Sequence, residues 1–315
     1  MKVGIHLPTV GPRATAHNIV AVAEEAERLG FDAVSLGDHV VVPYQINSWY
    51  PNRASGRAPI SGQEAHLDSF TTLSYVAART QRVRLVMAVC VLPYRNPLVT
   101  AKMVATLDHL SGGRVVFGVG VGWMAEEFAA LGVPFADRGK RTDEYIRVFR
   151  ALWKEGHASF QGQFMQFAEV GCFPLPVQRP GPPILVGGHS RRALLRAVEL
   201  GDGWIASGLS PEEVQAKLQD LRSLCEQYGR DTSTLQAVVS VDTLPGSLSA
   251  VGLRVKFGRD YGDQGPASDT PLEAALHQFS RLGVDMVLLR IPAAVLASDP
   301  SVLEAAVSCL AATGP

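Results

Sequence analysis

One short sequence pattern occurs three times in this chain and constrains its fold more than any other feature. In each copy a helix with an apolar face ends at Leu-Gly, an aspartate follows directly or after one residue, and an apolar run comes next. The copies are Leu29–Asp32, Leu200–Asp202 and Leu282–Asp285. Glycine after a last helical turn supplies a left-handed cap without steric cost. The apolar runs are short and do not alternate with polar residues, which is typical of parallel strands covered by helices. The three copies predict that the chain repeats one β–α unit throughout.

The rest of the sequence completes a set of eight candidate strands that alternate with helical patterns. The strands are expected at residues 3–7, 33–36, 83–89, 114–119, 183–186, 204–206, 235–241 and 286–291. The helical patterns cover residues 17–29, 70–80, 97–110, 125–131, 142–153, 191–200, 211–228, 271–282 and 301–311. This alternation predicts an α/β protein of the (β/α)8 TIM barrel type. No linker rich in Gly, Pro or Ser divides the sequence, so we expect a single barrel domain over residues 1–315.

Three longer stretches do not fit the bare repeat and are expected as insertions after strands 2, 4 and 7. They cover residues 40–68, 155–182 and 245–270. Long segments in a compact domain are usually functional lids or disordered. The first and third follow the carboxyl ends of strands, where a barrel places its chemistry, so both should overhang the catalytic face.

The composition excludes several classes of function. The net charge is −1 with dispersed Lys and Arg, which gives no support for binding nucleic acid or an anionic membrane. No apolar run approaches the roughly 20 residues of a membrane span, and the N-terminus has the pattern of a strand rather than of a signal peptide. The four cysteines are far apart and form no Cys-x-x-Cys pair, which favours a cytoplasmic protein without a metal site.

Two polar residues follow the second strand at the end where a barrel carries its catalytic groups. His39 is the side chain best suited to exchange a proton near neutral pH, and Asp38 is placed to orient it or to share the site. The alternative is that Asp38 caps a turn and His39 is a solvated loop residue. Cys90, after the third strand, is by itself expected to be a buried and unreactive thiol.

Glycines gather at the end of the fourth strand. Gly118, Gly120 and Gly122 let a planar ligand or a phosphate approach the backbone, with close packing of strand and helix as the alternative. Their spacing differs from the G-x-G-x-x-G pattern, so a Rossmann nucleotide site is disfavoured.

A second glycine segment, Gly187-Gly188-His189-Ser190, follows the fifth strand and opens a helix. Free backbone N–H groups and the helix dipole make such a segment an anion site. Ser190 is also a good N-cap, and both roles can hold together. Ser207, at the end of the neighbouring sixth strand, is placed to add a hydroxyl to the same anion.

Together these motifs resemble the luciferase-like monooxygenase superfamily, and within it the subgroup of coenzyme F420-dependent oxidoreductases. The resemblance runs essentially from end to end. The motifs that carry it are Gly37-Asp38-His39, Arg95-Asn96-Pro97, Thr106-Leu107-Asp108, Ser111–Arg114, Gly118–Trp123, Glu127-Phe128, Gly132–Phe135, Arg138, Asp143-Glu144, Val186–Gly188 and Gly201–Trp204.

The resemblance implies a flavin or deazaflavin that lies across the strand ends, with its phosphate bound by the loop after strand five. It also implies a non-prolyl cis peptide at Cys90-Val91 against the cofactor ring. His39 and Asp38 match the place where deazaflavin members carry a residue near the reactive ring. Trp123 stands where sugar-phosphate dehydrogenases of the group carry a Glu, which argues against that substrate class. The candidate cofactor-binding residues are Cys90, Val91, Gly120, Gly122, Gly187, Gly188, His189, Ser190 and Ser207.

Three functions remain in competition. The first is F420-dependent hydride transfer to or from a small organic substrate. The second is an FMN-dependent monooxygenase that uses reduced flavin and oxygen, with a flavin reductase as partner. The third is a barrel that binds a cofactor or ligand without turnover. The resemblance also implies a homodimer that pairs through outer helices.

Overall fold

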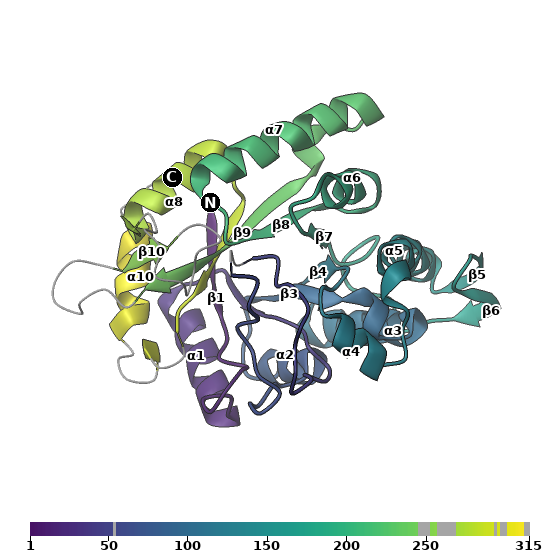
Figure 1. Ribbon diagram of the computed structural model, residues 1–315, viewed down its shortest axis with the longest axis horizontal. Coiled ribbons are helices and arrows are strands. Elements are labelled where there is room, and N and C mark those ends of the chain that lie inside the picture. Colours follow the sequence, from purple (N-terminus) through teal and green to yellow (C-terminus); the bar gives the residue numbers. More distant parts are fainter. Residues whose placement is uncertain (53–54, 245–252, 257–268, 293–294, 297–300, 312–315) are drawn as a thin grey trace.

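A closed barrel of eight parallel strands forms the centre of the computed structural model, which describes residues 1–52, 55–244, 253–256, 269–292, 295–296 and 301–311 (Figure 1). The barrel strands are β1 (Lys2–His6), β2 (Ala33–Leu36), β3 (Arg84–Val91), β4 (Val115–Gly120), β7 (Ile184–Gly187), β8 (Gly203–Ser207), β9 (Gln236–Leu244) and β12 (Met286–Arg290). They pair in this order, and β12 pairs with β1 to close the ring. Each predicted strand is present with ends shifted by up to three residues, so the predicted (β/α)8 barrel is confirmed.

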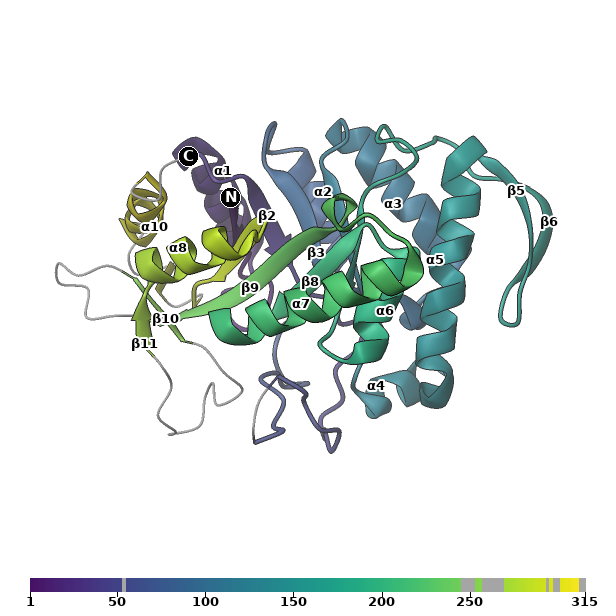
Figure 2. The same cartoon turned by 90° about the horizontal axis from the view of Figure 1, so that it is seen from above.

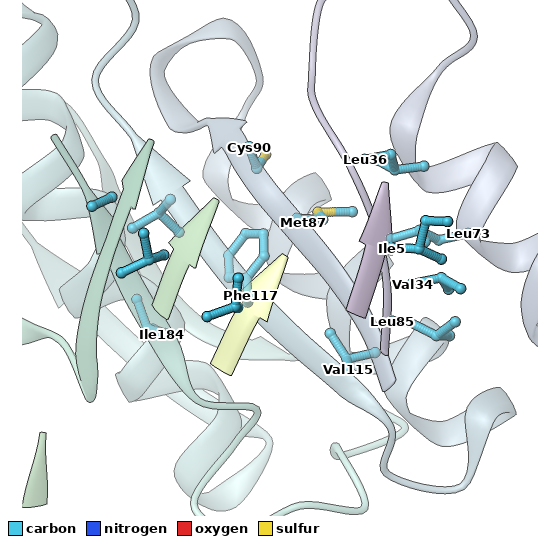
Figure 3. Packing of buried hydrophobic residues seen from close by; sticks show 14 of the residues in the cluster. Ile5, Val34, Leu36, Leu73, Leu85, Met87, Cys90, Val115, Phe117 and Ile184 are labelled. Carbon is cyan, nitrogen blue, oxygen red and sulfur yellow. The ribbon is translucent and has the colours of Figure 1, made fainter. Parts of the chain in front are cut away.

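Helices surround the barrel on the outside (Figure 2). They are α1 (Ala16–Leu29), α2 (Ser69–Ala77), α3 (Pro97–Ser111), α4 (Ala125–Ala130), α5 (Arg138–Glu155), α6 (Arg191–Leu200), α7 (Pro211–Tyr228), α8 (Leu272–Leu282) and α10 (Ser301–Ala311), with 3-10 turns η1 (Leu92–Tyr94), η2 (Phe135–Asp137) and η3 (Thr232–Thr234). Buried side chains form two larger clusters and a third, small one around Val91. One lies between strands and helices and includes Ile5, Met87 and Phe117 (Figure 3). The second is a smaller cluster formed by Ala33, Val86, Val116, Leu185, Ile205, Val238, Met286 and Leu288.

The repeated aspartates have one shared structural role. The carboxylate Oδ2 of Asp32 accepts a hydrogen bond from the backbone N–H of Val3 at 2.8 Å. Asp202 accepts in the same way from Ile184, and Asp285 from Ala237, both at 2.7 Å. Each aspartate therefore pairs the N–H at the start of a neighbouring strand, which would otherwise lack a partner.

The repeated glycines are less uniform than predicted. Gly30 and Gly283 adopt the left-handed cap, with φ of 90° and 81°. Gly201 instead has a φ of −91° and continues as extended chain. A Cβ there would lie 3.0 Å from Cγ2 of Val186, so this glycine is needed for close approach to β7 rather than for its backbone angle.

The second insertion contains structure that the sequence patterns did not predict. Residues 155–182 include an antiparallel hairpin, β5 (His157–Gln161) and β6 (Gln166–Gly171), which projects beyond α5 (Figures 1 and 2). In the third insertion, β10 (Arg254–Lys256) and β11 (Asp269–Pro271) extend β9 as an antiparallel edge. Apart from Leu253, which is buried, the other residues of this insertion lie outside the described ones. No helix among the described residues is both long and apolar enough to cross a membrane.

Candidate active site

The carboxyl ends of β3, β4 and β7 present a surface of backbone and small side chains. A non-prolyl cis peptide joins Ala88 to Val89 within β3. A Cβ at Gly120 would lie 2.7 Å from Cγ2 of Val89, and one at Gly187 would lie 3.1 Å from its Cγ1. A side chain at Gly120 would clash with Val89, and one at Gly187 would crowd it, so glycine lets β4 and β7 pack closely against β3 here.

The cis peptide predicted at Cys90-Val91 is therefore wrong by two residues. The strand does not end before Cys90, because Cys90 and Val91 still pair with Val119 and Gly120 of β4, and the register shift lies between Met87 and Cys90. The Cys90 side chain is fully buried with the other core residues (Figure 3), and Val91 packs in a cluster with Tyr94 and Phe128. Burial, followed by the charge of Asp38, raises the pKa of the Cys90 thiol. Contact of Cys90 and Val91 with a cofactor stays a prediction.

The Asp38 carboxylate is buried, and its hydrogen bonds go to residues other than His39. The carboxylate accepts two hydrogen bonds from the Arg95 guanidinium at 2.7 and 2.8 Å. It also accepts the Ser69 hydroxyl at 2.8 Å and the backbone N–H of Val91 at 2.9 Å. Asp38 thus ties the end of β2 to the end of β3 and to the start of α2.

His39 instead bonds to a glutamate from a distant part of the chain. Its Nδ1 lies 2.7 Å from Oε2 of Glu127, which is in the first turn of α4 and is fully buried. The His39 side chain keeps 18% of its surface exposed. No described residue makes a hydrogen bond to its other ring nitrogen, Nε2, which remains free to exchange a proton with a ligand.

Aromatic side chains surround His39. The rings of His66 and Trp123 meet it edge to face at centroid distances of 6.0 and 6.3 Å, and Tyr50 packs on Trp123 at 5.0 Å. Burial, and then the neighbouring His39, lower the pKa of His66, so its imidazole is neutral at neutral pH. Its buried Nε2 has no hydrogen-bond partner among the described residues. An orphaned polar atom beside a candidate catalytic group is a natural contact for a polar substrate.

The glycine loop after β7 brings together the residues that were predicted to bind an anion. The φ of Gly188 is 114°, which favours glycine, and its carbonyl accepts the indole N–H of Trp204 at 2.8 Å. The Ser190 hydroxyl caps α6 by accepting the N–H of Ala193. The backbone N–H of Ser207 donates to Nε2 of His189 at 3.4 Å.

Two further observations bear on the ligands that this end of the barrel can hold. The hydroxyl of Ser207 is buried, and in the described part of the chain it has no hydrogen-bond partner, so it suits an incoming phosphate oxygen. The second concerns Gly122, where a Cβ would lie 2.7 Å from the ring of Phe128 and 2.8 Å from Val91, while its contact with a ligand stays a prediction. Gly122 is therefore required for packing against α4.

Sequence reasoning missed the roles of Glu127 and His66. The Glu127-Phe128 pair contributes to the family resemblance, but a glutamate in a first helical turn usually indicates only a favourable dipole interaction. The one available signal was its place on a short helix directly after the strand-four glycines. His66 lies in the middle of a long insertion with no periodic pattern to place it.

The fold and site define a (β/α)8 barrel with its candidate polar groups and glycine loop at the carboxyl ends of the strands, as in enzymes of this architecture. The chain belongs to the luciferase-like monooxygenase family, whose sequence pattern matches residues 1–251.

The relatives and structural neighbours differ in cofactor. An uncharacterised protein of Mycobacterium tuberculosis is 34% identical over 226 residues, which is 71% of this chain and 79% of that protein. An FMNH2-dependent dimethylsulfone monooxygenase of Pseudomonas putida is 33% identical over 171 residues, which is 53% of this chain and 47% of that enzyme. The solved structure of an F420-dependent secondary alcohol dehydrogenase superimposes with a TM-score of 0.75 at 15% identity, covering 100% of this chain and 99% of that one.

Proposed function

We propose that the protein is an F420-dependent oxidoreductase that moves hydride to or from a small organic substrate. The observation that carries the proposal is His39, which is held through Nδ1 and keeps Nε2 available at the carboxyl end of β2. When bound, F420 supplies a ring carbon that gives or takes hydride. Oxidation of an alcohol to a carbonyl also releases a proton from oxygen, and the reverse reaction needs one. His39 suits this exchange near neutral pH.

Other residues bind and position the reactants in this proposal. The cofactor phosphate would bind to the loop formed by Gly187, Gly188, His189 and Ser190, and to the Ser207 hydroxyl. Val89 would support the ring. Trp123 and Tyr50 provide an apolar wall beside His39, which favours a substrate with apolar groups next to the reacting carbon.

The second candidate is an FMN-dependent monooxygenase supplied by a separate flavin reductase. The 33% identity to the P. putida dimethylsulfone monooxygenase favours this alternative. The two candidates differ in their need for oxygen, because hydride transfer between F420 and an alcohol consumes none.

Turnover with and without oxygen tests the proposal. The purified protein is incubated without oxygen with oxidised F420 and a panel of secondary alcohols, and F420 absorbance is followed. In parallel, reduced FMN is supplied with oxygen and a panel of sulfones and ketones. We expect oxygen-independent reduction of F420 with at least one alcohol. Turnover seen only with reduced FMN and oxygen would establish the second candidate instead.

A further inference from the structure

We propose that Glu127 is a positioning residue that fixes the protonation pattern of His39 with one carboxylate oxygen and holds the adjoining loop with the other. The inference deepens the proposed function, on which it rests, by specifying which nitrogen of His39 meets the substrate. It starts from the position of Glu127, whose side chain is fully buried and joins two segments 88 residues apart in the sequence.

The two oxygens of Glu127 have separate partners. Oε2 lies 2.7 Å from Nδ1 of His39. Oε1 accepts the backbone N–H groups of Val40 and Val41 at 2.7 and 3.2 Å. An ionised carboxylate can only accept hydrogen bonds, so Nδ1 must carry the proton in this contact. In neutral His39 the lone pair is then on Nε2, which is the state required to take a proton from a substrate hydroxyl.

Hydrogen-bond donors surround the Glu127 carboxylate. It accepts two backbone N–H groups in addition to the imidazole. The Tyr94 hydroxyl is also nearby, and burial together with the Glu127 charge raises the pKa of Tyr94, so the phenol stays protonated. Within the described residues Glu127 forms no ion pair with Lys or Arg.

Because the two oxygens of Glu127 bind different partners, Glu127→Gln is an informative variant. A glutamine keeps one oxygen to accept Val40 and Val41, so the loop should stay in place. Its other terminal group is an NH2, which donates and cannot accept. Opposite that group, Nδ1 must lose its proton and become the acceptor, and the proton of neutral His39 moves to Nε2. The variant should therefore reverse the tautomer of His39 while it preserves the loop.

Glu126 provides a matched control on the same helical turn. Its Oε1 accepts the backbone N–H groups of Asn47 and Ser48 at 2.8 and 3.0 Å, and its Oε2 accepts the Ser48 hydroxyl at 2.7 Å. Glu126 thus also anchors the first insertion, and none of its hydrogen bonds involves His39. In Glu126→Gln the tautomer of His39 should be that of the unmodified protein.

The experiment is nitrogen NMR of the histidine rings in the free protein at neutral pH, with the His39 signals assigned from a His39→Asn variant. We expect a protonated Nδ1 in the unmodified protein and in Glu126→Gln, and a protonated Nε2 in Glu127→Gln. A His39 that keeps its protonated Nδ1 in Glu127→Gln would overturn the inference, as would a mixture of tautomers in the unmodified protein.

Turnover gives a second readout that separates this inference from the proposed function. If His39 exchanges the proton, Glu127→Gln should lower kcat with F420 by about 10²–10⁴-fold, with far less change in cofactor affinity. The NMR result needs neither cofactor nor substrate. Reversal of the tautomer without any loss of kcat would therefore count against His39 as the acid–base group, and it would leave the positioning by Glu127 intact.

Discussion

Replacement of Asp38 by asparagine should destabilise the protein strongly, because this carboxylate neutralises a largely buried arginine. Asp38 has a side-chain exposure of 1%, and its partner Arg95 has 13%. Burial disfavours the charge of Arg95, but the bonds to Asp38 outweigh it and raise the pKa of the guanidinium. Breaking a buried ion pair from one side typically costs 3–5 kcal/mol. Asparagine keeps the shape of the side chain and one acceptor oxygen. We therefore expect the free energy of unfolding to fall by about 3 kcal/mol, at the lower end of that range.

The assay is urea unfolding followed by tryptophan fluorescence, in which the variant should unfold at lower urea with an unchanged slope. Asp68→Asn is the control. Asp68 makes only a 3.4 Å contact to Arg95 from a side chain that is 44% exposed, and asparagine still caps α2, so the expected loss is below about 1 kcal/mol. If Asp38→Asn were as stable as this control but inactive, Asp38 would act on the substrate or cofactor, as its position in the sequence first suggested, and our reasoning would be refuted.

Three further predictions concern stability, cofactor binding and assembly. Burial, followed by the charge of Arg290, lowers the pKa of His6 to about 3, so between pH 6.5 and 3 only the unfolded chain binds this proton. The free energy of unfolding should therefore fall by up to about 2 kcal/mol from pH 7 to pH 5 on account of His6. A His6→Gln variant that loses as much free energy of unfolding over this range as the unmodified protein would contradict this. Ser207→Ala should weaken cofactor binding about tenfold and leave the unfolding midpoint unchanged, because the hydroxyl has no partner in the described structure; unchanged affinity in a fluorescence titration would place the phosphate elsewhere. We expect a homodimer paired through outer helices, where Tyr75 of α2 and Leu110 of α3 are 49% and 68% exposed, and a monomer in light scattering at micromolar concentration would exclude it.

The barrel was predictable because its signals are local. Each strand is a short apolar run, and each repeated aspartate lies two or three residues after a helix end, so the pattern of residues 29–36 can be read at three of the β–α units from sequence alone. The hairpin of β5 and β6 was not predictable in this way. None of its strand residues is fully buried, and although β5 alternates exposed and partly buried residues, that alternation covers only five residues, which is too short to mark a strand by itself.

The candidate site was predictable only in part. Position identified His39 and the glycine loop, because the carboxyl ends of parallel strands share one face of a barrel. Position did not reveal the direction of side chains that are adjacent in sequence. Asp38 turns into the protein towards Arg95, and His39 turns towards Glu127, and both partners lie more than 50 residues away. The cis peptide was misplaced for a similar reason, because the register of β3 depends on its pairing with β4.

The central claim is that the strand ends bind a deazaflavin for hydride transfer, and equilibrium titration of the purified protein with F420 and with FMN tests it most directly. Both cofactors are fluorescent, so quenching reports binding under identical conditions, and Ser207→Ala is titrated alongside to show that the signal comes from this site. We predict saturable quenching of F420, weaker binding of FMN, and a loss of F420 affinity in the variant. Tighter binding of FMN than of F420, or no saturable binding of F420, would contradict the claim.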